Sequence, residues 1–407
     1  MRLKQAALKT TVVGRKTTKR TSMVASSLLA AGLITVLPAQ AQPNHAVSPP
    51  HYRIVDLGQV GLNGQPFGVT NTGLVAGVVQ NGNNVHAALW FLGRMVDLDT
   101  PGLKGPNSMA FGMNLWGQAV GEAQTNHPDP KGEDFCGFTA LGLQSSGTTC
   151  VPFVWQNGVM NALPTLGGGN GFADQINSLG EAAGTAEDNT VDSTCPSGGA
   201  QKLQFKPVVW QNGGIHGLAT YPGDPDGNAH AINDVAQVAG ESGVCAPFNP
   251  IWLTNLQPLH ALLWEDGKVI NLGSLGGTGY GNGISALNLN NRGQVIGFSD
   301  LKGDADFHGF VWNQGSGMQD LGTVSGDVNS AAIGINDAGQ IVGVSLDASF
   351  NPRAFLRLDQ SLIDLNTLVP ANSPLYLATA CSINAAGEII GIAFDSTGNL
   401  HAYMAVP

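Results

Sequence analysis

The chain has 407 residues, of which 12% are charged, about half of the usual ~25%, and 56 are glycine, roughly twice the average share. Its 43% apolar content is too high for a disordered chain, and no collagen-type glycine period is present. The formal net charge of −11 argues against nucleic acid or an anionic membrane surface as a partner, because both attract basic proteins.

The first 41 residues have the pattern of a secretory signal peptide. Seven of the 18 basic residues and none of the 29 acidic residues lie in this segment. An apolar run over 23–38 follows, and Ala-Gln-Ala at 39–41 matches a cleavage site. The run is shorter than the ~20 apolar residues that span a bilayer, so a membrane anchor is the weaker interpretation. After cleavage 11 basic residues would stand against 29 acidic ones, a net charge of −18, and 42–51 would be a linker.

One phrase, Ile-Asn-x-x-Gly-Gln-Val-x-Gly, recurs seven times after the signal segment. The closing Gly is present in every copy, and the Asn is present in six, with Thr70 in the first. Asn and Gly tolerate positive φ, so each copy predicts two strands joined by a tight turn. The copies lie at 69–77, 113–121, 176–184, 232–240, 289–297, 335–343 and 383–391.

Two further phrases accompany every copy in a fixed order. An Asp-Leu-Gly strand precedes it, and a His-Ala-apolar-apolar-Trp strand follows it, most fully at 86–90, 260–264 and 308–312. The repeated His is predicted to be structural rather than a metal ligand, because Pro152, Pro207 and Arg353 replace it in other copies.

Each repeat therefore predicts four antiparallel strands, and the mean spacing of about 50 residues is typical of propeller blades. The fold class expected for 52–407 is all-β: a seven-bladed β-propeller of four-stranded antiparallel blades. A lone Asp-Leu-Gly strand at 52–58 and a lone His-Ala strand at 401–406 flank the repeats. We expect the N-terminal strand to complete the last blade, which would close the ring and remove its open sheet edges.

The repeats resemble those of the HAF-family extracellular repeat proteins of bacteria. The resemblance rests on Gly-Ile-Asn-Asp-Ala-Gly-Gln-Ile-Val-Gly at 334–343, Asp-Leu-Gly-Thr at 320–323, Leu-Gly-Gly at 275–277 and the His-Ala-x-x-Trp strands. It covers essentially all of 52–407, although the literal His-Ala-Phe triplet is replaced by His-Ala-Tyr at 401–403 and Arg-Ala-Phe at 353–355. It implies an exported repeat protein and supplies no catalytic residues.

Candidate site residues are departures from the repeat. Two residues before the Ile of the Asn strand most copies have an apolar side chain, whereas the third, fourth and seventh have Asp174, His230 and Cys381. A carboxylate and an imidazole on neighbouring inner strands can form an acid–base pair if they face each other, so Asp174 and His230 are the catalytic candidates. The alternative is a hydrogen-bonded buried polar pair without catalytic function.

Three consecutive repeats have long insertions between the second and third strands, at 122–151, 185–206 and 241–259. We expect all three on one face of the disc, where propeller loops commonly carry function. The binding candidates there are Glu122, Glu241, Asp224 and Asp226. Asp224 and Asp226 also offer oxygen ligands for a structural Ca²⁺, and no other cofactor is expected. Solvated loop acids without a ligand are the alternative.

Four of the five cysteines lie in these insertions. The favoured disulfides are Cys136–Cys150 within one insertion and Cys195–Cys245 between neighbouring insertions, as an oxidising compartment allows. Cys381 is left as a buried free thiol.

Two functional hypotheses follow. The first is a monomeric binding or interaction propeller, secreted or periplasmic, that holds an extracellular protein or glycan through the insertion-bearing face, with no membrane span after signal removal. The second is a secreted glycan-active enzyme, a polysaccharide lyase or hydrolase, with its site at the channel mouth. An enzyme would have a deep polar pocket at His230 and Asp174 with a further cationic or Tyr side chain directed inward. A binding module would have a shallow, loop-built surface.

Overall fold

The computed structural model describes residues 50–59, 66–91, 94–98, 103–139, 143, 146–197, 199, 201–249 and 254–407. The predicted signal peptide at 1–41 and most of the predicted linker lie outside the described residues. Among the described residues, no helix is both long and apolar enough to cross a membrane.

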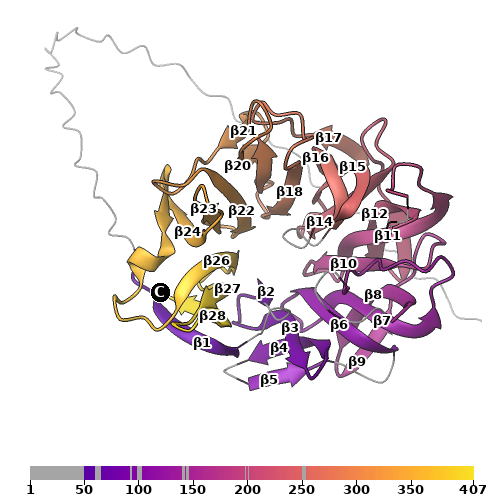
Figure 1. Cartoon of the computed structure of the whole chain (residues 1–407), viewed down its shortest axis with the longest axis horizontal. Coiled ribbons are helices and arrows are strands. Elements are labelled where there is room, and N and C mark those ends of the chain that lie inside the picture. The colour runs from indigo at the N-terminus through magenta and orange to yellow at the C-terminus, as the bar shows by residue number, and fades with distance from the viewer. Residues whose placement is uncertain are drawn as a thin grey trace, which may run out of the picture. The chain divides into compact units, whose positions relative to one another are not determined.

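Seven four-stranded antiparallel sheets surround a central axis, as expected, and Figure 1 shows them as blades of a ring. We number the blades in chain order, and the first strand of each lies innermost. Blade one has β2 (Pro66–Val69), β3 (Val75–Asn81), β4 (Asn84–Phe91) and β5 (Arg94–Asp97). Blade two has β6 (Lys104–Met113), β7 (Ala119–Pro128), β8 (Thr148–Gln156) and β9 (Val159–Ala162). Blade three has β10 (Gly171–Ile176), β11 (Ala182–Val191), β12 (Leu203–Gln211) and β13 (Gly214–Gly217).

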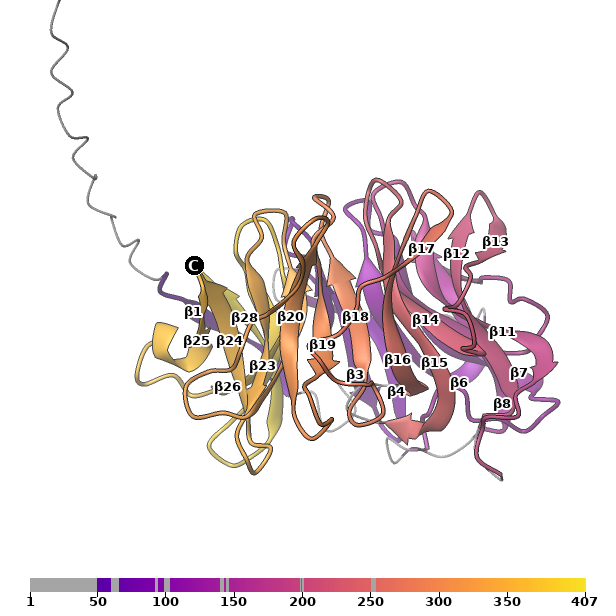
Figure 2. The same cartoon turned by 90° about the horizontal axis from the view of Figure 1, so that it is seen from above.

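The remaining blades continue the same order, and Figure 2 shows the ring from the side. Blade four has β14 (Asp226–Ile232), β15 (Val238–Asn249), β16 (Thr254–Glu265) and β17 (Lys268–Asn271). Blade five has β18 (Ile284–Leu289), β19 (Val295–Asp300), β20 (Phe307–Asn313) and β21 (Gly317–Asp320). Blade six has β22 (Asn329–Ile335), β23 (Ile341–Leu346), β24 (Pro352–Leu358) and β25 (Ser361–Asp364), followed by a short 3-10 helix, η1 (Leu365–Leu368).

Blade seven joins the two ends of the described chain. Its sheet order is β1-β28-β27-β26, with β26 (Tyr376–Ile383), β27 (Ile389–Phe394), β28 (Leu400–Val406) and the N-terminal β1 (Arg53–Gln59). The register pairs Arg53 with Val406 and Gln59 with His401, and His401 Nδ1 lies 3.0 Å from Asp56 Oδ1. The predicted closure of the ring by the N-terminal strand is therefore confirmed.

The closing Gly of the repeat is required by the close approach of two strands. A Cβ added to Gly297 would lie 1.9 Å from the carbonyl oxygen of Ser285 on the inner strand, and one at Gly343 would lie 2.0 Å from that of Ala331. No side chain fits in such a space, which explains why every repeat ends in glycine.

The Asn of the repeat links each blade to the next. Its Oδ1 accepts from two backbone N–H groups of its own turn, as Asn290 does from Arg292 and Gln294. Its Nδ2 donates to the carbonyl oxygen of the equivalent residue in the following blade, at 2.8–3.1 Å. The last of these bonds runs from Asn384 to Thr70 and so crosses the closure of the ring.

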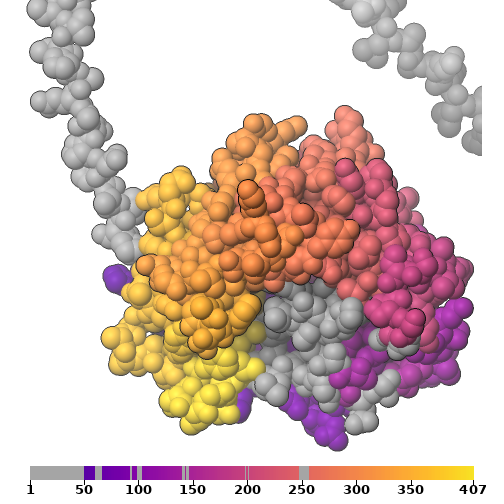
Figure 3. Space-filling model, turned by 45° about the horizontal axis from the view of Figure 1, so that its top comes forward, coloured from indigo at the N-terminus to yellow at the C-terminus, as the bar shows by residue number. Residues whose placement is uncertain are grey.

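The apolar core lies between neighbouring blades. The cluster around Ala231, Leu263, Leu289 and Phe310, for example, combines side chains of blades four and five. The space-filling view shows blades five to seven, in orange and yellow, packed in direct contact (Figure 3).

The three insertions are partly strand, which differs from the sequence-based expectation of loops: strands cover 11 of 30 residues in the first insertion, 11 of 22 in the second and 15 of 19 in the third. Their backbones continue the ladders of their hairpins, as in the pairs Gln124–Cys150 and Asn249–Thr254, because an extended hairpin satisfies its own N–H and C=O groups. The residues between the paired strands of the three insertions are 129–147, 192–202 and 250–253, the last of which lie outside the described residues. Glu122 and Glu241 consequently lie on β7 and β15 and not on loops.

Candidate functional site

A cavity of about 360 Å³ lies where the inner strands converge. Its volume is within the ~300–1,000 Å³ range of small-molecule sites. All seven repeats contribute the side chain that stands two positions before the end of the inner strand. These seven are Phe67, Phe111, Asp174, His230, Leu287, Ile333 and Cys381.

Asp174 and His230 meet across blades three and four, and the structure adds a third member. His230 Nδ1 lies 2.7 Å from Asp174 Oδ2, and His230 Nε2 lies 2.8 Å from Glu241 Oε1. Glu241 is held in turn, because Asn228 Nδ2 donates to its Oε1 at 3.1 Å and Ser285 Oγ donates to its Oε2 at 2.6 Å. Both ring nitrogens of His230 are therefore engaged by carboxylates.

The surroundings of His230 favour its charged form. Burial alone would lower the pKa of His230, but the charge of Glu241 and the hydrogen bonds with Asp174 and Glu241 outweigh it and hold that pKa well above the ordinary value. Burial raises the pKa of Asp174, although the hydrogen bond with His230 acts in the opposite direction. The imidazolium is thus a fixed cation between two acids, without a ring nitrogen free to accept a proton.

Glu122 on β7 faces the same cavity. Its side chain is buried, and its only close polar contact in the described chain is Cys150 Sγ at 3.9 Å, a disulfide sulfur that carries no hydrogen to donate. Burial and the negative charges of Asp174 and Asp134 hold the pKa of Glu122 well above its ordinary value. The surroundings of Glu122 therefore favour its protonated form, and no N–H or O–H group of the described chain donates to it.

Four phenylalanines form an aromatic row along one side of the cavity. The ring centroids of Phe67 and Phe111 are 5.1 Å apart, those of Phe111 and Phe172 6.2 Å, and those of Phe172 and Phe135 5.9 Å. Phe135 belongs to the connection of the blade-two insertion, so this insertion supplies part of the cavity wall. We call these four residues the aromatic row.

The cavity meets neither sequence-based expectation in full. Inner strands rather than loops supply most of its lining residues, yet most of its wall is apolar. Among the described residues that line it there is no Lys, Arg or Tyr to serve as the further inward-facing group expected of an enzyme.

A second acidic cluster lies between the insertions of blades two and three. Amide groups alternate with the acids: Asn170 Nδ2 donates to Asp129 and Glu187, both at 2.9 Å, and Gln201 Nε2 donates to Glu187 at 2.7 Å. Glu133 accepts from the backbone N–H groups of Lys202 and Leu203. Burial, together with the nearby charge of Glu133, raises the pKa of Glu187 to about 8. These contacts join the two insertions.

The remaining binding candidates, Asp224 and Asp226, form hydrogen bonds with different residues. Asp224 Oδ2 lies 2.8 Å from His260 Nδ1 and accepts from Ser242 Oγ at 2.5 Å. Asp226 is fully buried and accepts from Phe205 N at 3.0 Å. Burial and the interaction with the neighbouring acid Asp192 raise the pKa of Asp226 to about 9. The expected Ca²⁺ site gains no support from these contacts and stays a prediction.

Both favoured disulfides are present, Cys136–Cys150 and Cys195–Cys245. Each lies beside a carboxylate, Glu122 and Asp192 respectively, but disulfide sulfurs offer no thiolate for a metal. Cys381 is free and lines the cavity, and burial raises the pKa of its thiol to about 11.

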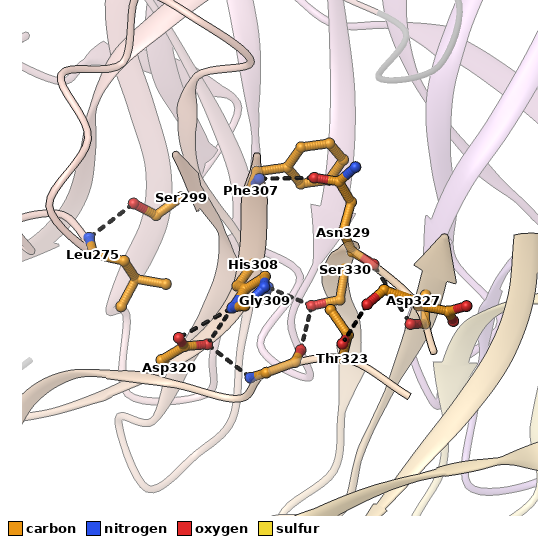
Figure 4. A network of polar contacts seen from close by, with 12 residues as sticks. Leu275, Ser299, Phe307, His308, Gly309, Asp320, Thr323, Asp327, Asn329 and Ser330 are labelled. Carbon is orange, nitrogen blue, oxygen red and sulfur yellow. Dashed lines mark hydrogen bonds and ion pairs between the residues drawn. The ribbon is translucent and has the colours of Figure 1, made fainter. Parts of the chain in front are cut away.

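The repeated His has a local partner in each copy that retains it. His308 Nδ1 lies 2.9 Å from Asp320 Oδ1 on the next strand, and Asp320 Oδ1 also accepts from Gly322 N at 2.7 Å. Figure 4 shows these bonds beside those that tie blade five to blade six, such as Gly309 N to Ser330 Oγ. At His86, His308 and His401 this partner lies on the adjacent strand, so the His contributes to strand pairing in three of the four copies.

Comparisons with known proteins support the β-propeller fold and no more specific property of this chain. No family model matches the chain, and no curated protein matches it. Similar solved structures include the β-propeller domain of the Trilobed protease from Pyrococcus furiosus, at 9% identity over 87% of this chain and 93% of that chain, with a TM-score of 0.46. Trypanosoma rangeli sialidase shares 8% identity over 85% of this chain and 54% of that one, with a TM-score of 0.37. At these scores the comparisons carry no argument about activity, and the resemblance to the HAF family stays a prediction.

Proposed function

We propose that this protein is an exported ligand-binding propeller, secreted or periplasmic, which holds its ligand in the central cavity beside the blade-two insertion. Two disulfides and the absence of a membrane-spanning helix among the described residues are compatible with that location. The ligand would be a small molecule or the protruding group of an extracellular glycan or protein.

The observation that carries this proposal is the state of His230. A general base needs a nitrogen lone pair, but both nitrogens of His230 are committed to Asp174 and Glu241. The apolar wall with a few convergent polar groups is instead typical of a site that binds.

A screen of the mature protein against small molecules and glycans tests the proposal, with calorimetric titration of every hit. We expect ligand binding that is lost when Phe111→Trp fills the cavity and kept when the exposed Phe350, far along the chain in blade six, is replaced by Trp. Hits that bind the Phe111→Trp variant with unchanged affinity would contradict the central cavity as the site.

One observation favours the alternative of a glycan-active enzyme. A carboxyl with a raised pKa (Glu122) and a second acid (Asp174) face one cavity, and glycosidases need such a pair. Turnover on a polysaccharide panel that disappears in Glu122→Gln and His230→Ala, with the fold intact, would establish the enzyme and overturn the binding-only proposal.

A further inference from the structure

The aromatic row and Glu122 stand together in the cavity wall, and their combination narrows the ligand class. Ring faces of phenylalanine attract cations as well as apolar groups. The inner-strand members of the row come from three successive blades, and Phe135 extends it from the blade-two insertion. An aromatic wall on its own would suit any apolar ligand.

The carboxyl group of Glu122 favours a cationic ligand over a neutral apolar one. It is 4% exposed, it lines the cavity, and the described chain supplies no N–H or O–H donor to it. A buried carboxylate without a counter-charge is costly, and an incoming ligand that brings positive charge would compensate it.

The charged groups around the cavity also favour a cationic ligand. His230 is the only titratable base among the described lining residues, and Asp174 and Glu241 more than compensate its charge. Asp134, on the connection of the blade-two insertion, adds a negative charge near Glu122. Among the lining residues that the structure describes, no uncompensated positive group is available for an anion.

We propose that the cavity binds an organic ammonium ion, held against the aromatic row with its charge at the carboxyl of Glu122. This inference rests on the proposed function, because it assigns a ligand class to the same cavity. The cation favours the ionised carboxylate of Glu122, so that binding releases a proton wherever free Glu122 is protonated.

Affinity for the cation should therefore rise with pH. At a pH below the raised pKa of free Glu122, binding must expel the proton, and this cost shrinks as pH approaches that pKa. The groups that face Glu122 from neighbouring elements are Asp174 on β10 and Asp134 on the insertion, with His230 behind Asp174. A neutral ligand of the same shape should show no such pH dependence.

The test compares choline with its uncharged isostere 3,3-dimethylbutan-1-ol, both titrated calorimetrically into the mature wild-type protein. We expect choline to bind at least about tenfold more tightly at pH 7.5, with proton release detected in buffers of different ionisation enthalpy. Because this comparison uses the wild-type protein, it does not depend on the folding of a variant.

Two variants sharpen the result. Glu122→Gln should weaken choline binding by about tenfold to a hundredfold, abolish proton release and leave the alcohol unaffected. Glu187→Gln, which removes a buried acid outside the cavity lining, is the matched control and should leave choline binding unchanged.

Each remaining outcome overturns the inference. If the alcohol binds as tightly as choline, the cavity is an apolar site, and the proposed function stands without the ammonium ligand. If choline binds without proton release or with full affinity to Glu122→Gln, Glu122 is not its partner. If neither compound binds, the ammonium ligand is wrong, and the proposed function is judged by its own screen.

Discussion

Asp226 and Asp192 are two acids whose interaction inside the fold raises the pKa of Asp226. In the unfolded chain an aspartate titrates near pH 4, whereas burial and the pair with Asp192 raise the pKa of Asp226 to about 9 in the fold. The folded state therefore binds more protons than the unfolded state between these values. The contribution of Asp226 to the free energy of unfolding is therefore fully present below about pH 4 and is lost as pH rises towards 9.

Asp226→Asn should remove this dependence. The amide nitrogen can donate to Asp192, and its oxygen can still accept from Phe205 N. We expect the variant to melt at least about 2 °C above wild type at pH 9 and with a smaller difference at pH 5, by thermal denaturation followed with circular dichroism. The exposed Asp266→Asn should match wild type at both pH values, and an unaltered decline in Asp226→Asn would contradict the raised pKa of Asp226.

His230 offers a second prediction at the residue scale. His230→Gln would leave Asp174 and Glu241 buried without their common cation, which should lower the free energy of unfolding by about 3 kcal/mol or more at pH 7. His308→Gln breaks the more exposed pair with Asp320 and should cost less than about 1 kcal/mol. Equal effects in urea denaturation would show that His230 is no more than another strand-pairing histidine.

The sequence identified part of this site by its departures from the repeat. Asp174 and His230 were recognisable because the other repeats have mostly apolar residues at their position. Glu122 and Glu241 share a second such position, directly after the closing Gly, where four of the other five repeats have an apolar residue such as Val78 or Phe298. That signal would have linked both acids to the channel. The partners Glu187, Asn170 and Gln201 could not be found, because only the folded insertions bring them together.

At the scale of single elements, the ring of asparagines has one gap. Thr70 replaces Asn in blade one, and its hydroxyl accepts within its own turn but makes no bond to Asn114 O in the next blade. The other six copies each donate across this junction.

Thr70→Asn should complete the ring. One added buried hydrogen bond stabilises by about 0.5–1.5 kcal/mol, so the melting temperature should rise by about 1–4 °C. Asn290→Ala removes an existing link at an equivalent position and should lower it by more, because it also leaves two backbone N–H groups without their acceptor. No change in Thr70→Asn would mean that the Asn side chains act within their own turns only.

The sequence was informative about hairpins and less so about their length. Asn-x-x-Gly turns marked the junction of first and second strands in five of the seven blades, and blades one and four depart from this pattern at Thr70 and Ala236. The insertions carry no such turn signal near their starts, so the sequence suggested loops where β7, β11 and β15 continue. The pairing of Gln124 with Cys150 depends on a cross-strand register that composition does not reveal.

At the scale of the whole molecule, the ring was predictable because each repeat buries its apolar surface against its neighbours, and a closed set of seven leaves no end exposed. The cavity volume was not predictable, since it depends on how seven inner side chains of unequal size meet. Two polar and five mostly bulky apolar or sulfur side chains occupy equivalent positions, and only their combination defines the space.

Closure by β1 is the feature on which the whole ring depends. β1 covers β28, and Tyr52 just before it is buried in the cluster that contains Leu377, Ile389 and Tyr403. A chain that begins at residue 60 would expose the edge of β28 and remove Tyr52 from this core, which favours edge-to-edge association. We expect it to aggregate or to melt well below wild type, by light scattering and calorimetry. A chain that begins at residue 50 keeps every β1 contact and should match the mature protein, whereas a monomeric residue-60 chain with unchanged melting would show that blade seven is stable with three strands.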